Sequence, residues 1–260
     1  MTIPLAVENK LSHALITDRL QVDRLLEERL CGQTGVVGDA MRYAVLEGGQ
    51  RLRPILAVRV AGLLGRVTEI TLRAASAVEL LHCASLLVDD LPCMDNDTVR
   101  RNRPAVHIQF GESTAILAAF SLIGLAARTV ADQPQFQLHL LRMLDASSLV
   151  GGQALDLALH GQDRENQRLR VTDLKTVPLF QLAVEAGLLE TGDRHRQRLL
   201  GFGRELGIAY QMMDDYLDGE IDDRSAVERQ FSQARALLAP FGESAANLHS
   251  FLDHLNVKAD

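Results

Sequence analysis

The chain has 260 residues, enough for one large domain or two small ones, and nearly half of them are apolar. Its net charge of −7 gives no basic footprint for nucleic acid, and its few aromatic residues favour helices over sheets. Cys31, Cys83 and Cys93 form no CxxC pair, which argues against a disulfide framework and favours a reducing cytosol.

No stretch of the sequence suggests a membrane span. Residues 1–10 lack the basic start and apolar core of a signal peptide. The longest apolar runs, 74–88 and 115–127, fall short of the ~18 residues that a transmembrane helix needs. We therefore expect buried helices, a cytoplasmic location and no transmembrane segment.

Helical periodicity recurs from end to end of the chain. The predicted helices, in chain order, cover residues 11–30, 37–47, 55–64, 70–90, 112–130, 134–159, 172–190, 194–218 and about 225–255. The helix 70–90 is apolar nearly all round, which marks a core helix, and Leu91-Pro92 ends or kinks it. No alternating strand pattern competes, so the sequence predicts a single all-α domain over residues 1–260.

Glycine pairs mark two further features of this pattern. Gly48-Gly49 predicts a turn between the second and third helices, and Pro54 then occupies a first helical turn. Gly151-Gly152 falls inside the predicted helix 134–159, where small residues admit a ligand or a close helix contact.

Two aspartate clusters, each following a long apolar stretch, carry the main chemical signal. The first comprises Asp89, Asp90 and Asp95, with Asp97 just beyond, and the second comprises Asp214, Asp215 and Asp218. Carboxylates this close repel one another unless a cation lies between them, and Mg²⁺ takes one or two carboxylates together with substrate phosphates. On a helix, Asp214 and Asp218 share one face and Asp215 points away. The clusters predict a cavity that holds a diphosphate through magnesium.

Each signal alone has a plainer interpretation. One cluster could equally be helix-end carboxylates in solvent, although two clusters favour metal. A di-iron bundle needs Glu-x-x-His pairs, of which we expect none, so it is discounted. Two groups of arginines suit phosphate binding, because a guanidinium donates two parallel hydrogen bonds: Arg51 and Arg53 form one group, and Arg100, Arg101 and Arg103 form the other. Either group alone could equally lie on a surface loop. A lone Lys175 is ordinarily a solvated side chain, and His82 alone is more often a hydrogen-bonded core residue.

Taken together in chain order, these motifs resemble those of the trans-type polyprenyl (isoprenyl) diphosphate synthases. The segments that carry the resemblance span most of the chain: Gly48–Pro54, His82–Asp95, Arg100–Pro104, Gly152–Leu157, Lys175-Thr176 and Gln211–Asp218. The stretch His82–Asp95 most resembles bacterial geranylgeranyl diphosphate synthases. The resemblance implies an isoprenoid-synthase-type helical bundle around a central apolar cavity, and a homodimer.

The implied reaction is the Mg²⁺-dependent head-to-tail condensation of isopentenyl diphosphate with an allylic diphosphate, with Mn²⁺ as the alternative ion. The implied metal ligands are Asp89, Asp95 and Asp214, with Asp90 in support. The implied contacts to the allylic diphosphate are Arg100 and Lys175. On the isopentenyl side they are Gln50, Arg53, His82 and Arg101, and Thr176 and Gln211 would lie near the reacting groups. Ala84, the fifth residue before the first motif, is a small tunnel floor that favours geranylgeranyl diphosphate (C20) over farnesyl diphosphate (C15).

The chain departs from the family pattern at two places. Gln50 stands where the family has lysine, and no lysine occurs between Lys175 and Lys258, so the lysine-bearing loop after the second motif is shortened at about 219–225. Two hypotheses follow: an active enzyme with a trimmed lid and weaker substrate binding, or a weakened or inactive paralogue that serves as a partner subunit. A terpene cyclase on the same fold ranks third.

Overall fold

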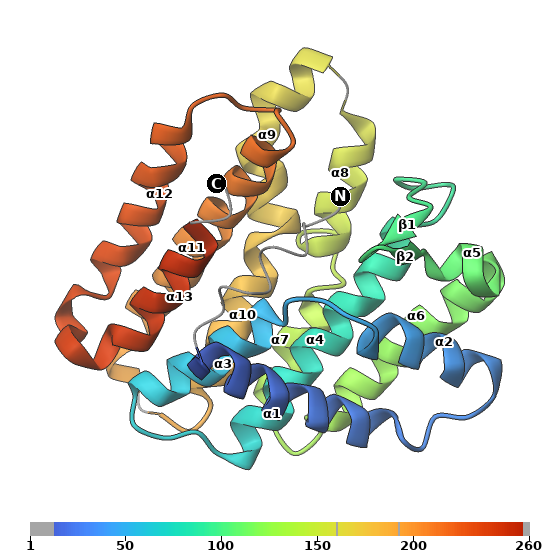
Figure 1. Ribbon diagram of the computed structural model, residues 1–260, viewed down its shortest axis with the longest axis horizontal. Helices are drawn as coiled ribbons and strands as arrows, with labels where there is room; N and C mark the ends of the chain where they lie inside the picture. Colours follow the sequence, from blue (N-terminus) through green and yellow to red (C-terminus); the bar gives the residue numbers. More distant parts are fainter. Residues whose placement is uncertain (1–12, 160, 192, 257–260) are drawn as a thin grey trace. The chain divides into compact units, whose positions relative to one another are not determined.

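The computed structural model describes residues 13–159, 161–191 and 193–256. The expectations for residues 1–12, which include the absence of a signal peptide and the first two positions of the predicted helix 11–30, lie outside the described residues. Within the described residues the chain is almost entirely helical (Figure 1). The all-α fold class is therefore confirmed.

The described residues form two compact units, each assembled from separate stretches of the chain. Unit 1 contains the described residues up to Ile55 together with Leu72–Leu140. Unit 2 contains Leu56–Thr71 and the described residues from Leu141 onward. The first aspartate motif belongs to unit 1 and the second to unit 2.

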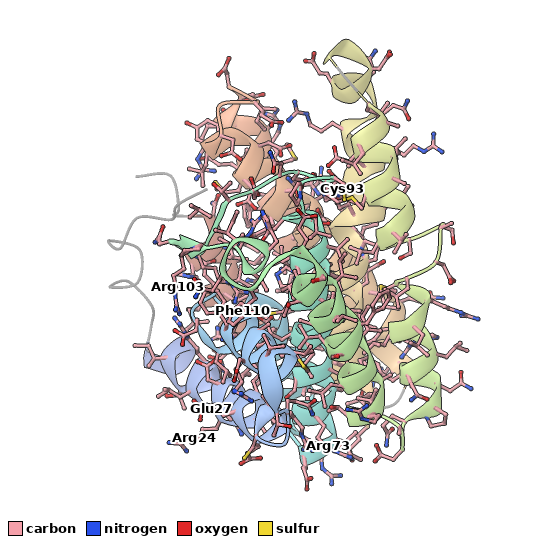
Figure 2. All side chains as sticks on the ribbon, turned by 90° about the vertical axis from the view of Figure 1, so that its right-hand side faces the viewer. Arg24, Glu27, Arg73, Cys93, Arg103 and Phe110 are labelled. Carbon is pink, nitrogen blue, oxygen red and sulfur yellow. The ribbon has the colours of Figure 1, made fainter. Side chains whose placement is uncertain are left out.

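Unit 1 packs its helices around α2. Its elements are α1 (His13–Leu30), α2 (Gly35–Leu46), the start of α3 (Leu52–Leu63), most of α4 (Glu69–Asp89), β1 (Val99–Arg100), β2 (Arg103–Pro104), α5 (Val106–Phe110), α6 (Glu112–Thr129) and most of α7 (Pro134–Arg142). Helix α2 contacts α1, α5 and α6. Helix α1 buries Val22, Leu26 and Leu30, spaced one turn apart, while Arg24 and Glu27 point into solvent (Figure 2).

Helix α4 is the apolar core helix that the sequence predicts. It ends at Asp89, one residue before the predicted end, and its buried apolar residues include Val78, Leu81 and Leu87. Among the described helices it alone is long and apolar enough to cross a membrane, but 67% of its apolar window is buried. A mostly buried core helix of a soluble protein passes the same test, so this helix is weak support for a membrane span.

Unit 2 is built around α10 and α11. Its elements are the rest of α3, the start of α4, the end of α7, α8 (Leu149–Ala158), α9 (Gly161–Lys175), α10 (Val177–Leu188), η2 (Asp193–His195), α11 (Arg196–Leu217), α12 (Arg224–Leu237), η3 (Ala239–Ala245) and α13 (Ala246–Asn256). Helix α11 lies between α10 and α12, and α9 contacts α8, α10 and α11 (Figure 1). These contacts bring the second aspartate motif, at the end of α11, beside α9.

Three predicted helices are interrupted. The predicted helix 134–159 is wrong as one element, because a turn closed by the Ser148 N–H bond to the Asp145 carbonyl separates α7 from α8. The predicted helix 172–190 begins inside α9 and breaks at Thr176, where Pro178 enters the first turn of α10. The predicted helix 225–255 breaks near Gly242, whose φ is 53°. The part of α9 before residue 172 was not predicted.

A short hairpin was also not predicted. Strands β1 and β2 pair antiparallel, with Val99 opposite Pro104 and Arg100 opposite Arg103. Arg101 and Asn102 form the turn with φ of 53° and 62°, the left-handed values that a tight hairpin turn requires. Strands of two residues are too short to show an alternating pattern, so the expectation that no strand occurs is wrong here.

The prediction for Gly152 is confirmed as a close helix contact. A β-carbon built on Gly152 would lie 2.7 Å from backbone atoms of Leu174 and Lys175. Any larger side chain would therefore push α8 away from α9. The glycine allows the two helices of unit 2 to approach at the position where Lys175 begins the link to α10.

Candidate active site

The first aspartate motif folds back on itself at the end of α4. The Asp90 N–H extends the helix by bonding to the Leu86 carbonyl at 3.0 Å. The Asp95 N–H then donates to the Asp89 carbonyl at 2.9 Å, so the intervening residues form a closed loop. Asp89 is half-buried and Asp95 is exposed. The loop therefore brings the backbones of two aspartates that are six positions apart back together.

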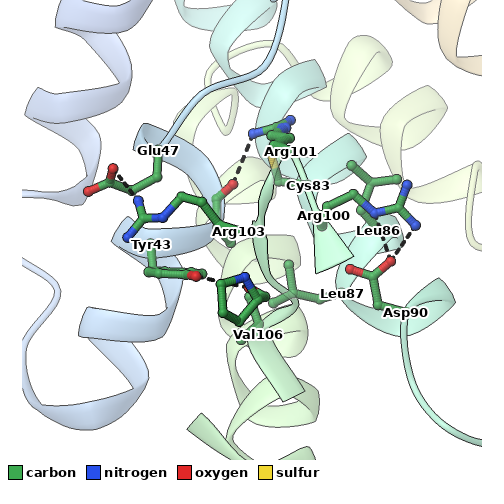
Figure 3. A pocket seen from close by; sticks show the side chains of 12 residues that line it. Tyr43, Glu47, Cys83, Leu86, Leu87, Asp90, Arg100, Arg101, Arg103 and Val106 are labelled. Atoms are coloured by element: carbon green, nitrogen blue, oxygen red, sulfur yellow. Dashed lines mark hydrogen bonds and ion pairs between the residues drawn. The ribbon is translucent and has the colours of Figure 1, made fainter. Parts of the chain in front are cut away.

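Asp90 has a different role from these two. Its side chain is only 2% exposed, and its Oδ1 accepts a 2.8 Å hydrogen bond from Nε of Arg100 and another from Nη2 (Figure 3). Arg100 also donates to Asp97 at 2.5 Å. Burial raises the pKa of Asp90, and the hydrogen bonds from Arg100 oppose this shift. Asp90 is therefore held in an ion pair inside the protein, and this ion pair fixes the end of α4 next to Asp89.

A pocket in unit 1 lies against this ion pair (Figure 3). Its wall comes from α2, α4 and the hairpin, and it includes Tyr43, Cys83, Leu87, Asp90, Arg100 and Arg101. At its rim Arg103 pairs with Glu47, and its guanidinium lies 4.3 Å from the ring centre of Tyr43. Arg103 thus braces the hairpin against α2.

The arginine that turns the hairpin is held against the end of α2. Nη1 of Arg101 donates to the carbonyl oxygens of Ala44 and Gly48 at 3.1 and 3.0 Å. A β-carbon on Gly49, whose φ is 96°, would lie 2.6 Å from the guanidinium carbon of Arg101. The glycine pair is therefore a turn, as predicted, and it also makes room for this arginine.

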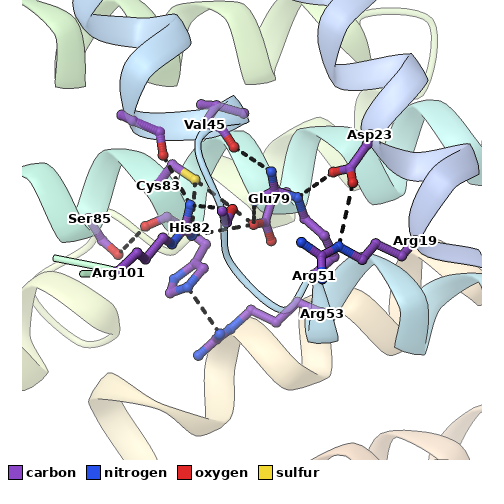
Figure 4. Close-up of polar contacts among 12 residues, drawn as sticks. Arg19, Asp23, Val45, Arg51, Arg53, Glu79, His82, Cys83, Ser85 and Arg101 are labelled. Atoms are coloured by element: carbon purple, nitrogen blue, oxygen red, sulfur yellow. Dashed lines mark hydrogen bonds and ion pairs between the residues drawn. The ribbon is translucent and has the colours of Figure 1, made fainter. Parts of the chain in front are cut away.

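Arg53 and His82 form a second polar contact (Figure 4). Nη1 of Arg53 lies 3.2 Å from Nε2 of His82. Since a guanidinium only donates, Nε2 accepts and neutral His82 carries its proton on Nδ1. Burial, reinforced by the charge of Arg53, lowers the pKa of His82 well below its ordinary value. Nδ1 is buried and has no partner in the described part of the chain, so its proton is available to a ligand oxygen.

Arg51 belongs to the protein interior and not to an exposed anion-binding loop. It is 3% exposed and adopts a φ of 55°. Nη1 donates to Glu79 at 3.0 Å, Nε donates to Asp23 at 2.7 Å, and Nη2 donates to the Val45 carbonyl (Figure 4). Burial disfavours its charge, but Glu79, Cys83 and Asp23 together outweigh this effect, so the pKa of Arg51 is raised above its ordinary value.

The expectation that no Glu-x-x-His pair occurs is wrong, because Glu79 and His82 have this spacing on α4. Their partners differ, however, because Glu79 pairs with Arg51 whereas His82 contacts Arg53. Among the described residues no group of three or more His, Cys, Asp or Glu side chains is arranged to hold a metal. A single pair is also fewer than the Glu-x-x-His pairs that a di-iron bundle takes from two of its helices.

The second aspartate motif ends α11 in unit 2. Asp214 is half-buried, and the Asp218 N–H caps the helix by donating to the Asp214 carbonyl at 3.0 Å. Partial burial, followed by the charge of Glu220, raises the pKa of Asp218. The chain then crosses residues 218–223 and enters α12, whose first turn is capped by Asp223 accepting from the Ala226 N–H at 3.0 Å. The connection after the second motif is short, as predicted.

Asp215 lies on the inner side of α11. It is 7% exposed, and its two oxygens accept from Gln211 Nε2 at 2.9 Å and from Arg168 Nη1 at 3.0 Å. The Thr176 hydroxyl donates to Gln211 Oε1 at 2.8 Å, which extends the network to the start of α10. Two residues that the resemblance implicates, Thr176 and Gln211, are thus brought together with the second motif.

Lys175 precedes this network at the end of α9. Its Nζ donates to Asp156 Oδ2 on α8 at 2.8 Å, and the lysine is half-buried. This differs from the solvated side chain that a lone lysine would ordinarily be. The same contact accounts for Asp156, to which the sequence alone gives no role.

The carboxylates of both motifs suit a hard divalent cation. Mg²⁺ needs only one or two protein carboxylates when substrate phosphates complete its shell. The loop that joins Asp89 to Asp95 offers such a pair in unit 1, and Asp214 offers an oxygen donor in unit 2. Each motif thus offers, within its own unit, oxygen ligands of the kind that Mg²⁺ prefers when a diphosphate completes its shell.

Comparison with known proteins gives similarities over the stretch that contains both motifs. The family model "Polyprenyl synthetase" matches residues 35–231. Geranylgeranyl pyrophosphate synthase 10, mitochondrial, of Arabidopsis thaliana is 40% identical over 197 residues, covering 70% of this chain and 57% of the relative. The chain spans little more than half the length of that curated relative.

Solved structures match over a longer range. A geranyltransferase from Legionella pneumophila is 29% identical with a TM-score of 0.87, covering 95% of this chain and 96% of that chain. An FPP/GFPP synthase from Zymomonas mobilis is 31% identical with a TM-score of 0.85, covering 97% and 99%. Together with the helical architecture, these similarities confirm the predicted isoprenoid-synthase type of bundle.

Proposed function

Because the chain belongs to the polyprenyl synthetase family, we propose that it is a trans-prenyltransferase that joins isopentenyl diphosphate head to tail to an allylic diphosphate. The observation that carries the proposal is that both aspartate motifs lie intact inside the matched region, each at the end of a helix. We propose geranylgeranyl diphosphate as the main product, with farnesyl diphosphate as the shorter alternative.

The proposed chemistry begins at the allylic diphosphate. Asp89, Asp95 and Asp214 would hold Mg²⁺, or Mn²⁺ in its place, and the bound ion supplies neutralisation of the departing diphosphate. Arg100 and Lys175 would add charge-assisted hydrogen bonds to the same group. The allylic C–O bond then ionises, and apolar walls keep water from the carbocation.

The second substrate is isopentenyl diphosphate, whose double bond attacks the allylic cation. Arg53 and Arg101 are the proposed cations for its diphosphate, and Gln50 is a neutral donor there. The buried Nδ1–H of His82 is available for one diphosphate oxygen. A proton is then lost to the released diphosphate, so the protein needs no nucleophile of its own.

Purified protein incubated with isopentenyl and farnesyl diphosphates plus Mg²⁺ tests this function. We expect C20 product on chromatography and no product when EDTA removes the metal. Complete inactivity of folded, Mg²⁺-supplied protein would favour the partner-subunit hypothesis. The relatives named as synthases favour the enzyme instead. Gln50 and the short connection after Asp218 lead us to expect weaker substrate binding than in relatives that carry the lysines.

Replacing Ala84 by phenylalanine should shorten the product from C20 towards C15. Ala84 is 1% exposed on α4, so a larger side chain must take space from its surroundings, at a cost of about 1–3 kcal/mol in stability. The series Ala84→Ser, Ala84→Leu and Ala84→Phe should therefore shift products in order of side-chain size, measured by chromatography on variants whose melting shows a folded protein. An unchanged product distribution across the series would place the tunnel floor elsewhere.

The protein should form a homodimer through α6. This helix exposes Leu117 and Phe120, the latter 68% exposed, which is an unusual apolar surface for an isolated chain. Light scattering should give the mass of a dimer for the native chain and of a monomer for Phe120→Glu. Leu169→Glu, at an apolar residue that is 56% exposed on α9, is the matched control and should remain dimeric. A native monomer at working concentration would refute the prediction.

We further propose a cytoplasmic location. The most apolar helix of the described residues, α4, is largely buried within the protein, which leaves little apolar surface on it for lipid. Fractionation of cells that express the chain should recover it with the cytosol.

A further inference from the structure

Tyr43, on α2, makes three separate contacts with the segment that contains the hairpin and α5. Its hydroxyl donates to the Pro104 carbonyl at 2.9 Å. Its ring centre lies 4.3 Å from the Arg103 guanidinium, and its ring meets that of Phe110 nearly edge-on, with 5.4 Å between the ring centres. One side chain of α2 thus contacts both β2 and the end of α5.

Glu47 adds a second contact to the same strand. It lies one helical turn after Tyr43, at the end of α2, and its carboxylate pairs with Arg103. Arg103 lies directly opposite Arg100 in the hairpin, so the two like charges share one face and repel each other. Figure 3 shows Arg103 extending towards Glu47, whereas Arg100 extends to the other side of the pocket. There Arg100 bonds to Asp90 at the end of α4, so the hairpin is held between two helices of unit 1.

The hairpin has little support of its own. Each strand has two residues, and the turn residues Arg101 and Asn102 adopt left-handed φ values of 53° and 62°. An isolated two-stranded hairpin is only marginally stable in water, so contacts with the helices decide where its side chains lie. Tyr43 supplies such contacts and is not among the residues that we propose to touch substrate. It can therefore be replaced without removing a substrate contact.

We propose that Tyr43 is a positioning residue for diphosphate binding, because it fixes the hairpin against α2 and so places Arg100 and Arg101. The effect on substrate rests on the proposed function, whereas the effect on the hairpin rests on the contacts alone. Without this anchor both guanidiniums remain in the chain but are spread over several positions, so each diphosphate is held less tightly. The affinities for the two substrates should therefore fall together.

Hydrogen–deuterium exchange tests the anchor without any substrate. Tyr43→Phe removes only the hydroxyl, and the amides of residues 98–105 should then exchange about two- to fivefold faster, the effect of one exposed hydrogen bond. Tyr43→Leu also removes the contacts of the ring with Arg103 and Phe110, and exchange in the same residues should rise about tenfold or more. Amides of α10, in unit 2, should exchange at native rates in both variants, which verifies an intact fold.

Steady-state kinetics with farnesyl and isopentenyl diphosphates tests the consequence for substrate. In Tyr43→Phe the KM of both substrates should rise about two- to fivefold, while kcat changes less. Tyr43→Leu should raise both KM values further. A loss of folded protein would give the opposite result, because fewer active molecules lower the apparent kcat and leave KM unchanged.

Thr129→Val is the matched control. It also removes one hydroxyl that donates to a backbone carbonyl in unit 1, that of Leu125 at 2.8 Å, but it does so at the last residue of α6. This variant should keep native exchange in the hairpin and native KM values, whatever stability it loses.

Unchanged hairpin exchange in folded Tyr43→Phe and Tyr43→Leu would overturn the inference, and so would faster exchange with native KM values for both substrates. Equal changes in Thr129→Val would overturn it as well, because they would show a general loosening of unit 1. If exchange rises as expected but even the native chain makes no prenyl product, the proposed function is refuted and Tyr43 remains the anchor of the hairpin.

Discussion

Replacing Asp89 or Asp214 by alanine should each cut prenyl-transfer turnover by about two to three orders of magnitude. Stabilisation of developing charge by a bound metal is worth several kcal/mol in the transition state, and each ~1.4 kcal/mol is tenfold in rate. Neither side chain belongs to the apolar core, since both are half-buried at helix ends. The fold should therefore survive both substitutions.

The measurement is kcat as a function of Mg²⁺ concentration, with circular dichroism to verify the helical content of each variant. Asp222→Ala removes an exposed carboxylate from the connection just after the second motif and is the matched control, with near-native turnover expected. If either Asp89→Ala or Asp214→Ala keeps near-native activity with ordinary metal dependence, the two-motif model is wrong.

Glu79→Ala should destabilise unit 1 strongly, at a cost of about 3–5 kcal/mol in the free energy of unfolding. It would leave the guanidinium of Arg51, which is almost fully buried, without its most buried counter-charge. The 3.7 Å approach of Arg101 to the same carboxylate would be lost as well. Urea unfolding of purified protein measures the effect.

Two milder variants separate charge from volume in this network. Glu79→Gln keeps an oxygen acceptor and should cost less than Glu79→Ala. Asp23→Ala removes the outer, half-buried partner of Arg51 and should cost only about 1 kcal/mol. A Glu79→Ala chain that loses no more stability than Asp23→Ala would show that water or a backbone shift compensates the buried arginine.

Helices with strong apolar periodicity were predictable from the sequence. The ends of α4 and α11, which position both motifs, agree with the prediction because each helix has a buried face and ends in carboxylates. The first part of α9 was missed because Gly161–Val171 is polar nearly all round, so no periodic stripe marks it. The break before α10 was signalled by Pro178, which favours a first helical turn over a helix interior.

The candidate site was predictable only where chemistry lies in consecutive residues. Both aspartate motifs and the link from Lys175 to Thr176 are local signals. The pairing of Arg168 with Asp215 and of Arg51 with Glu79 joins residues 47 and 28 positions apart. Arg51 looked like an anion ligand because sequence shows charge but not burial, and burial decides whether a guanidinium meets substrate or protein.

The neutral state of His82 has a consequence for acid tolerance. In the unfolded chain a histidine takes up a proton near its ordinary pKa of 6.5, whereas folded His82 resists protonation because it is buried beside Arg53. Below that pH the unfolded state binds the extra proton, so His82 withdraws stability progressively as the medium is acidified and has no such effect above neutrality. The protein should therefore melt at a lower temperature at pH 5 than at pH 7.5 by an amount that His82→Gln reduces.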